Sequence, residues 1–334
     1  MEHVSTAMVP PCQKARWAPS PDWRLWLENT VALAGDEVDE VFADRPVLSF
    51  PHGGPQLAIV AESAGLLRAV GRYRPGSVPV RMEVRAGECL TRLLIPAEEP
   101  QAVRWADYAA RVFFASRMLA DGWRMLHASA VALEGRAVLF LADQGGGKST
   151  LAHRACVELG AGFLADDLVL ISEEGMVVGW PTRVAVPAEL VRNADETSGL
   201  MPAIGQRRRV AFTPVEHRSV SGIEYSPPVP LGALVCIQSD QSATDPLRAS
   251  VLAGCSRESF VVMAADVPAQ HLFVSDLVGL MGGPRSASGR EPVAGTGKFW
   301  QVPAVLLTVG DMAGFARAPV WGVLAPLLSE FGER

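Results

Sequence analysis

A segment near the middle of the chain constrains the fold more than any other part of the sequence. It consists of the apolar run 137–141, the glycine-rich stretch 142–150 (ADQGGGKST), and a helical pattern over 149–159 that ends at Gly160. The apolar run does not alternate with polar residues, which is typical of a strand covered on both faces, as in a layered α/β sheet. Three apolar residues of the helix recur at every fourth position and are predicted to be buried: Leu151, Ala155 and Leu159.

The glycine-rich stretch matches the phosphate-loop pattern GxxxxGK[ST] at its last three positions, while Ala142 replaces the first glycine. Glycines allow backbone N–H groups to converge on a polyphosphate, and a helix N-terminus adds unpaired amides and the positive end of its dipole. We expect Lys148 to lie against the β- and γ-phosphates of ATP and the Ser149 hydroxyl to bind Mg²⁺. The predicted nucleotide-binding residues are Gln144, Gly145, Gly146, Gly147, Lys148, Ser149 and Thr150. The alternative is a connection that binds nothing, which the entropy lost by three consecutive glycines disfavours.

Two adjacent aspartates, Asp166 and Asp167, interrupt the apolar segment 163–171. We expect this segment to be a strand that returns beside 137–141, which brings both carboxylates near the phosphate loop. Adjacent residues point to opposite sides of an extended backbone, so one carboxylate can face Mg²⁺ while the other faces the substrate. The alternative is an Asp pair in a surface turn or a helix cap. The apolar flanks disfavour that alternative, because two buried carboxylates without a cation are costly to desolvate.

The length of 334 residues predicts two domains. Residues 1–22 are expected to be a flexible N-terminus, 23–125 a small α+β domain ending in a linking helix, and 126–334 an α/β domain that contains the phosphate loop. In the first domain we predict a helix over 102–125 and strands over 57–61, 80–84 and 91–95. In the second we predict a hairpin of 128–133 with 137–141, and strands over 168–171, 176–178, 184–186, 231–237 and 303–309.

Four further features of the sequence give weaker predictions. Pro187 is predicted to begin a helix, and His153 is placed on the exposed side of helix 149–159. The basic residues 207–209 either neutralise a transferring phosphate or form a solvated run. The glycine-rich segment 279–297 is predicted to be a long loop or a mobile flap.

Composition excludes several classes of protein. With 36 acidic and 30 basic residues the net charge is −6, so no basic surface for nucleic acid is indicated. The sequence has neither a membrane-length apolar stretch nor the apolar core of a signal peptide, so we expect a cytoplasmic protein that does not bind a membrane. Five scattered cysteines without a CxxC pair argue against a disulfide framework and a cysteine-rich zinc site. The sequence does not decide between a monomer and a homo-oligomer.

Three features together resemble the HPr kinase/phosphorylase family: His127 ahead of the predicted hairpin, the loop ADQGGGKST, and the aspartate pair within LADD. The likeness is closest to the kinase-related branch of that family found beside peptide natural-product gene clusters. It covers about residues 127–190 and extends more weakly to Val309. The resemblance implies a fold akin to that of phosphoenolpyruvate carboxykinase, and phosphoryl transfer from ATP to a serine hydroxyl.

The resemblance also implies a role for each site residue. Lys148 would bind phosphate, Ser149 and Asp167 would hold the metal, Asp166 would take the hydroxyl proton as general base, and His127 would lie close to the transferred phosphoryl group. The residues by themselves do not say which aspartate has which role. Besides Ala142, Thr150 departs from the family pattern by replacing a usually acidic residue. The region typical of the reverse phosphorolysis is not found, so that activity is not expected.

Three functions are compatible with these features. The leading hypothesis is an ATP-dependent kinase acting on a Ser or Thr hydroxyl of a peptide or small protein, since the residues ahead of the phosphate loop and the segment 279–297 could contact an extended substrate. The second is a kinase for a small molecule such as free serine or a sugar. The third is a regulatory protein that binds ATP and transfers nothing.

Overall fold

The structure is a computed structural model of the chain, and its described residues form two compact units that divide between residues 122 and 123. Both units combine helices with sheets, so the chain has a mixed α/β fold. The predicted N-terminus 1–22 and the segment 279–297 lie outside the described residues. The structure describes 24–30, 35–49, 56–63, 65–73, 76–96, 103–180, 183–191, 200–204, 207–243, 245–252, 254–265, 301–312 and 314–329.

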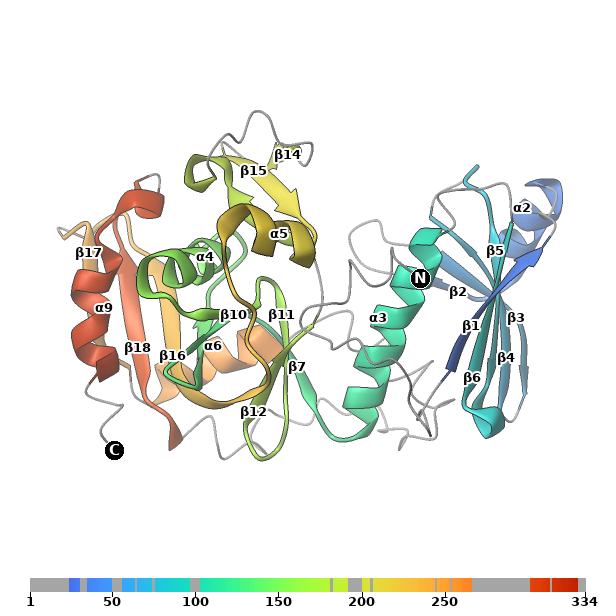
Figure 1. Cartoon of the computed structure of the whole chain (residues 1–334), viewed down its shortest axis with the longest axis horizontal. Helices are drawn as coiled ribbons and strands as arrows, with labels where there is room; N and C mark the ends of the chain where they lie inside the picture. The colour runs from blue at the N-terminus through green and yellow to red at the C-terminus, as the bar shows by residue number, and fades with distance from the viewer. Residues whose placement is uncertain are drawn as a thin grey trace. The chain divides into compact units, whose positions relative to one another are not determined.

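The first unit is built on a six-stranded sheet with the order β1-β6-β5-β4-β3-β2 (Figure 1). β1 and β6 are parallel, and the other neighbours are antiparallel. The predicted strands 57–61, 80–84 and 91–95 correspond to β3, β5 and β6. The elements are β1 (Arg24–Thr30), α2 (Gly35–Asp44), β2 (Val47–Ser49), β3 (Gln56–Ser63), β4 (Leu66–Arg72), β5 (Val80–Arg85), η2 (Ala86–Glu88), β6 (Leu90–Pro96) and α3 (Val103–Ala120).

Helix α3 supplies the largest side chain in the core of this unit. Trp105 is 1% exposed, and its ring lies so close to Gly71 of β4 that a Cβ atom there would be 2.4 Å from the ring. The rings of Tyr73 and Tyr108 pack against the same indole. The helix is shorter than the predicted range 102–125, because Gly122 takes a left-handed conformation (φ 85°) and the next residues form a strand.

The second unit contains a nine-stranded sheet in which β10, β8, β9, β16, β12, β11 and β7 follow one another, while β18 pairs with both β16 and β17. A separate three-stranded sheet has the order β13-β15-β14. The elements up to α5 are β7 (Arg124–His127), β8 (Ser129–Leu133), β9 (Arg136–Leu141), α4 (Lys148–Leu159), β10 (Gly162–Ala165), β11 (Leu168–Ile171), β12 (Met176–Gly179), β13 (Val184–Pro187), η4 (Ala188–Leu190), β14 (Leu200–Ile204), β15 (Arg207–Phe212) and α5 (Pro214–Ser221). The remaining ones are β16 (Val229–Ser239), β17 (Leu247–Val251), α6 (Cys255–Ala265), β18 (Ala304–Val309), η8 (Phe315–Arg317) and α9 (Val320–Ser329).

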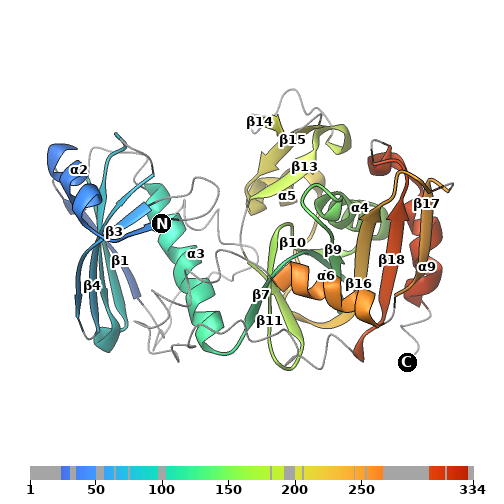
Figure 2. The ribbon, with the colours of Figure 1, turned by 180° about the vertical axis from the view of Figure 1, so that it is seen from behind.

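Helices cover both faces of the nine-stranded sheet. Leu151 of α4 and Leu324 of α9 belong to one buried cluster with Phe140 of β9. Val261 of α6 belongs to a second buried cluster with Leu139, the neighbour of Phe140 in β9. Successive side chains of a strand point to opposite faces, so α6 lies across the sheet from α4 and α9. Figure 2 shows α6 from the side opposite to Figure 1. β9 is therefore buried on both faces, as its apolar sequence predicts.

Four strands of this sheet run in the same direction. β9 is parallel to β16, and β16 is parallel to β18. β10 and β9 are each antiparallel to β8, which lies between them, so they are parallel to each other. The carboxyl ends of β9, β10, β16 and β18 therefore meet at one edge of the sheet. Ligands of α/β sheets bind beyond such an edge.

Several local predictions are confirmed. β8 and β9 form the expected hairpin, and Glu134 (φ 50°) and Gly135 (φ 74°) supply the two positive φ angles that its tight turn requires. Helix α4 begins within one residue of the predicted start and stops at Gly160, which has a left-handed conformation (φ 67°). The strands predicted over 168–171, 176–178, 184–186, 231–237 and 303–309 correspond to β11, β12, β13, β16 and β18.

Four local predictions are wrong. The segment 163–171 is two strands with a bend at the aspartates, and β10 does not return beside β9 because β8 lies between them. Leu159 is 39% exposed in the last turn of α4, and Pro187 ends β13, followed by a single 3₁₀ turn. His153 is 3% exposed, because α5 covers its side of α4 and places His217 against it.

The helices in the described ranges are all too short or too polar to cross a membrane.

Candidate active site

The glycine-rich loop connects β9 to α4 at the shared carboxyl edge of the parallel strands. Gly145 (φ 78°) and Gly147 (φ 95°) have left-handed backbones, and the N–H of Gly146 donates to the carbonyl of Asp143 (3.0 Å). Gly147 is the N-cap of α4, so no side chain caps the helix. The first N–H groups of α4 are therefore available to an external acceptor, as anion binding at a helix N-terminus requires.

Lys148 lies over the loop rather than in solvent. Its side chain is buried, and Nζ donates hydrogen bonds to the carbonyls of Ala142 (2.8 Å) and Asp143 (3.2 Å). Burial lowers the pKa of Lys148, while the charges of Asp167 and Asp166 act in the opposite direction. The structure thus places one cation between the loop and the aspartate pair.

Asp166 is buried at the bend that follows β10, with 6% of its surface exposed. Its Oδ2 accepts a hydrogen bond from the backbone N–H of Ala185 (2.8 Å), whereas Oδ1 has no hydrogen-bond partner among the described residues. Burial raises the pKa of this carboxyl, against the effects of the Ala185 N–H, the Ser149 side chain and the charge of Arg209. The hydroxyl of Ser129 donates to the Asp166 carbonyl and ties the bend to β8.

Asp167 has the opposite environment, because its side chain is 58% exposed. Its Oδ1 lies 3.1 Å from Nε2 of His127, the last residue of β7. Partial loss of hydration by itself would raise the pKa of Asp167. The hydrogen bond from His127 and the positive charges of His127, Lys148 and Arg209 outweigh that effect and lower the pKa. The two carboxylates therefore differ in both burial and partner.

Arg209 of β15, one of the basic residues 207–209, also acts on the aspartate pair. Its guanidinium donates to the carbonyl of Ala185 (2.8 Å), the residue whose N–H binds Asp166. Its positive charge opposes the rise that burial causes in the pKa of Asp166, and it contributes to the lowered pKa of Asp167. Its neighbour Arg208 is exposed, whereas Arg209 is half-buried.

The oxygen atoms near the loop fit a divalent cation that is held together with phosphate. Within the described ranges, no group of three or more His, Cys, Asp or Glu side chains could hold a metal by themselves. Mg²⁺ in nucleotide sites, however, needs only one or two carboxylates besides phosphate oxygens and water. The buried Oδ1 of Asp166 and the hydroxyl of Ser149 are hard oxygen donors of this kind. The residues present therefore fit Mg²⁺ bound with a nucleotide.

The structure brings most of the predicted residues to one place. Lys148 and Asp167 interact electrostatically, Ser149 acts on Asp166, and His127 contacts Asp167. Gln144 and Gly145 are exposed at the tip of the loop, whereas Thr150 is buried in the first turn of α4. Two site components have no signal in the sequence: Ser129 and Ala185. Ser129 acts on the backbone carbonyl of Asp166, and Ala185 acts through its own backbone N–H, so neither contact has a local sequence pattern. Arg209 belongs to the basic run 207–209, for which a role at a transferring phosphate was one of the two alternatives.

Comparisons with known proteins add little to this geometry. No family model matches the chain, and no curated protein matches it. Among solved structures, an HPr(Ser) kinase/phosphatase from Coxiella burnetii is similar to it. The two chains are 12% identical, the TM-score is 0.23, and the match covers 39% of this chain and 78% of that chain. A likeness this low does not establish a family. The function proposed for this chain therefore rests on the geometry of the site.

Proposed function

We propose that the protein is an ATP-dependent kinase that transfers a phosphoryl group to a hydroxyl of a Ser or Thr residue in a peptide or small protein. The observation that carries this proposal is the buried, unpartnered Oδ1 of Asp166 beside Ser149, at the uncapped N-terminus of α4. A loop that only connects β9 to α4 has no need of a desolvated carboxylate at this position.

The phosphates of ATP would lie against the N–H groups of the loop and the first turn of α4. Lys148 would exchange its hydrogen bonds to the carbonyls of Ala142 and Asp143 for the β- and γ-phosphates. Asp166 and Ser149 would hold Mg²⁺, which when bound neutralises charge on those phosphates. Arg209 would stabilise the negative charge of the transferring group, since its positive charge already acts on both carboxylates of the aspartate pair.

The environments of the two aspartates favour a division of labour opposite to the sequence-based hypothesis. That hypothesis made Asp166 the base and Asp167 a metal ligand. Asp166, however, is the carboxylate that is buried beside Ser149, whereas Asp167 is exposed and oriented by His127. A base must reach a substrate hydroxyl that arrives from solvent. We therefore assign the hydroxyl proton to Asp167, with His127 as its positioning residue.

The proposed reaction is balanced with ATP as the only co-substrate. The hydroxyl oxygen of the acceptor forms a bond to the γ-phosphorus, the bond from that phosphorus to the bridging oxygen of ADP breaks, and the hydroxyl proton passes to Asp167. A peptide is favoured over a metabolite as acceptor because the chain carries a complete additional unit, residues 24–122, for which a closed metabolite pocket has no use.

Two substitutions test the assignment. Asp166→Asn should weaken binding of Mg-ATP and remove its dependence on Mg²⁺. Asp167→Asn should leave ATP affinity close to that of the wild type and slow turnover by about 10²- to 10⁴-fold, the usual contribution of a general base. The matched control is Asp121→Asn, an exposed position in the first unit. Calorimetric titration measures affinity, and transfer of the γ-phosphate to Ser- and Thr-containing peptides measures turnover.

The possible results distinguish the competing functions. Exchanged effects of the two variants would restore the sequence-based division of roles. Phosphorylation of free serine as efficient as that of any peptide would replace the proposed acceptor class. ATP binding without transfer to any acceptor, unaffected by Asp167→Asn, would identify a regulatory nucleotide-binding protein.

A further inference from the structure

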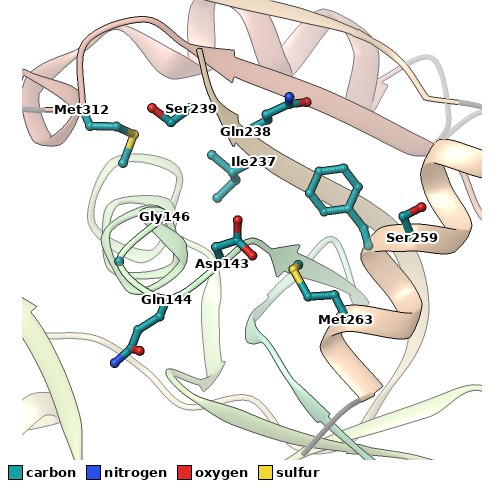
Figure 3. Close-up of a pocket in the computed structure, with 11 residues that line it drawn as sticks. Asp143, Gln144, Gly146, Ile237, Gln238, Ser239, Ser259, Met263 and Met312 are labelled. Carbon is teal, nitrogen blue, oxygen red and sulfur yellow. The ribbon is translucent and has the colours of Figure 1, made fainter. Parts of the chain in front are cut away.

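A pocket of about 760 Å³ adjoins the glycine-rich loop (Figure 3). One wall is the loop itself, residues 143–146. The second is the carboxyl end of β16, residues 237–239, and the third is the side of α6 that carries Phe260 and Met263. Met312, which follows β18, completes the lining. The volume lies in the range of pockets that bind small molecules and cofactors.

The order of strands places this pocket on the far side of the loop from the aspartate pair. β9, which leads into the loop, has β8 and β10 on one side and β16 on the other. Asp166 and Asp167 follow β10, whereas the pocket is lined by the end of β16 and by Met312 beyond β18. A ligand whose phosphates bind the loop, with the γ-phosphate toward the aspartates, would therefore extend its other end into the pocket.

The walls of the pocket have the chemistry of a nucleoside site. Ile237, Phe260, Met263 and Met312 provide aromatic, thioether and aliphatic surface for the flat faces of a base. Gln238 provides an amide that can both donate and accept hydrogen bonds. In Figure 3 the Asp143 carboxylate is directed toward Ile237 and the middle of the pocket, whereas the Gln144 side chain turns away from it. A carboxylate in this position can accept hydrogen bonds from ribose hydroxyls.

We propose that this pocket binds the nucleoside part of the phosphate donor, with the base against Phe260 and Met263 and the ribose hydroxyls on Asp143. The proposal rests on the proposed function, because it requires a nucleotide on the glycine-rich loop. It adds which residues recognise the nucleoside of that donor, and that affinity comes from the nucleoside as well as from the phosphates. Phe260 and Asp143 are then the residues that determine donor specificity.

The test compares three ligands by calorimetric titration of the full chain in the presence of Mg²⁺: ATP, 2′,3′-dideoxy-ATP and inorganic tripolyphosphate. The wild type should bind ATP at least about tenfold more tightly than tripolyphosphate. Phe260→Ala should weaken ATP binding about tenfold and leave tripolyphosphate binding unchanged, because stacking of one base on an aromatic side chain has about this effect. Asp143→Asn should reduce the preference for ATP over dideoxy-ATP. Val262→Ala, an exposed position of the same helix outside the pocket, is the matched control and should change none of these values.

Equal affinity of the wild type for ATP and tripolyphosphate would overturn the nucleoside site while leaving the phosphate loop intact. An unchanged preference for ATP over dideoxy-ATP in Asp143→Asn would overturn the ribose contact, even if Phe260→Ala failed to fold. A wild type that binds neither ATP nor tripolyphosphate would overturn the proposed function, and the nucleoside site with it. Lys148→Ala, which should weaken binding of both ligands, separates phosphate from nucleoside effects.

Discussion

At the scale of single residues, the site depends on sequence neighbours that differ strongly in solvent exposure and in hydrogen-bond partner. Asp166 and Asp167 are adjacent, yet one is 6% exposed and bound to a backbone amide, and the other is open to solvent and paired with His127. The bend between β10 and β11 produces this difference, because it directs one side chain into the unit and the other outward. Two chemical roles can therefore be assigned to one dipeptide.

Two glycines of the loop also differ in the space around them, although their backbones are alike. Gly145 and Gly147 both have positive φ, but a Cβ atom on Gly145 would meet nothing within 4 Å, whereas one on Gly147 would lie 2.3 Å from the buried ring of Phe315. Gly145→Ala should lower the free energy of unfolding only by the strain of the left-handed backbone, about 1–2 kcal/mol. Gly147→Ala should lower it by about 1–3 kcal/mol more, because the methyl group overpacks the core. Urea unfolding of both variants measures the difference, and equal losses would contradict the contact with Phe315.

At the scale of secondary-structure elements, a buried polar network joins the helix of the phosphate loop to its neighbour. His153 of α4 lies 3.2 Å from His217 of α5 through Nδ1 and Nε2, and His217 Nδ1 lies 3.1 Å from the hydroxyl of Tyr225. His153 also hydrogen-bonds the backbone of Leu190. The ring of Phe163 packs against both His217 and Tyr225. The network holds α4 against α5 and β10 without using any residue of the proposed reaction.

This network predicts how stability depends on pH. Burial lowers the pKa of His153 to about 4, and burial together with the charge of His153 lowers the pKa of His217 to about 3. Below about pH 6.5 both rings bind protons in the unfolded chain, whereas in the folded chain they stay neutral down to about pH 4. The stability that this contributes is therefore fully present above pH 6.5 and is lost as the pH falls toward 4, by up to about 1.4 kcal/mol per pH unit for each histidine.

Denaturant unfolding at a series of pH values between 4 and 7 measures this slope. His217→Phe should remove about one proton from the difference between the folded and unfolded states and reduce the slope accordingly. Tyr225→Phe, the matched control, should lower stability by about 1 kcal/mol, the contribution of a hydrogen bond, at every pH. A slope that is the same in His217→Phe and in the wild type would show that His217 is not kept neutral by burial.

At the scale of the whole molecule, every residue assigned to the site or to the adjoining pocket comes from the second unit. The loop, the aspartate pair, His127, Arg209 and the pocket residues all follow residue 122. The first unit has its own core, centred on Trp105. ATP binding and the packing of the first unit therefore use separate sets of residues.

A substitution in the core of the first unit tests this separation. In Gly71→Ala the new methyl group would lie 2.4 Å from the ring of Trp105, and we expect the first unit to lose about 1–3 kcal/mol of stability. ATP affinity should stay at the wild-type value. Calorimetry gives both quantities, as a lowered thermal transition and as an unchanged binding isotherm. The matched control Gly76→Ala, in open space and with a positive φ, should show only backbone strain. A parallel loss of ATP affinity in Gly71→Ala would contradict the separation of the two units.

Features that depend on neighbours along the chain can be predicted from the amino-acid sequence alone. Periodicity located β9 and most other strands, the Glu134-Gly135 turn defined the hairpin, and Gly160 defined the end of α4, because backbone conformation and strand pattern are local properties. The buried side of α4 could not be predicted in this way, since α5 and its His217 come from a distant segment. The same is true of the position of β8 between β10 and β9, and of the contacts that Ala185 and Arg209 make at the aspartate pair. Burial and partner choice depend on which distant segments meet at the carboxyl edge of the sheet, and no local pattern contains that information.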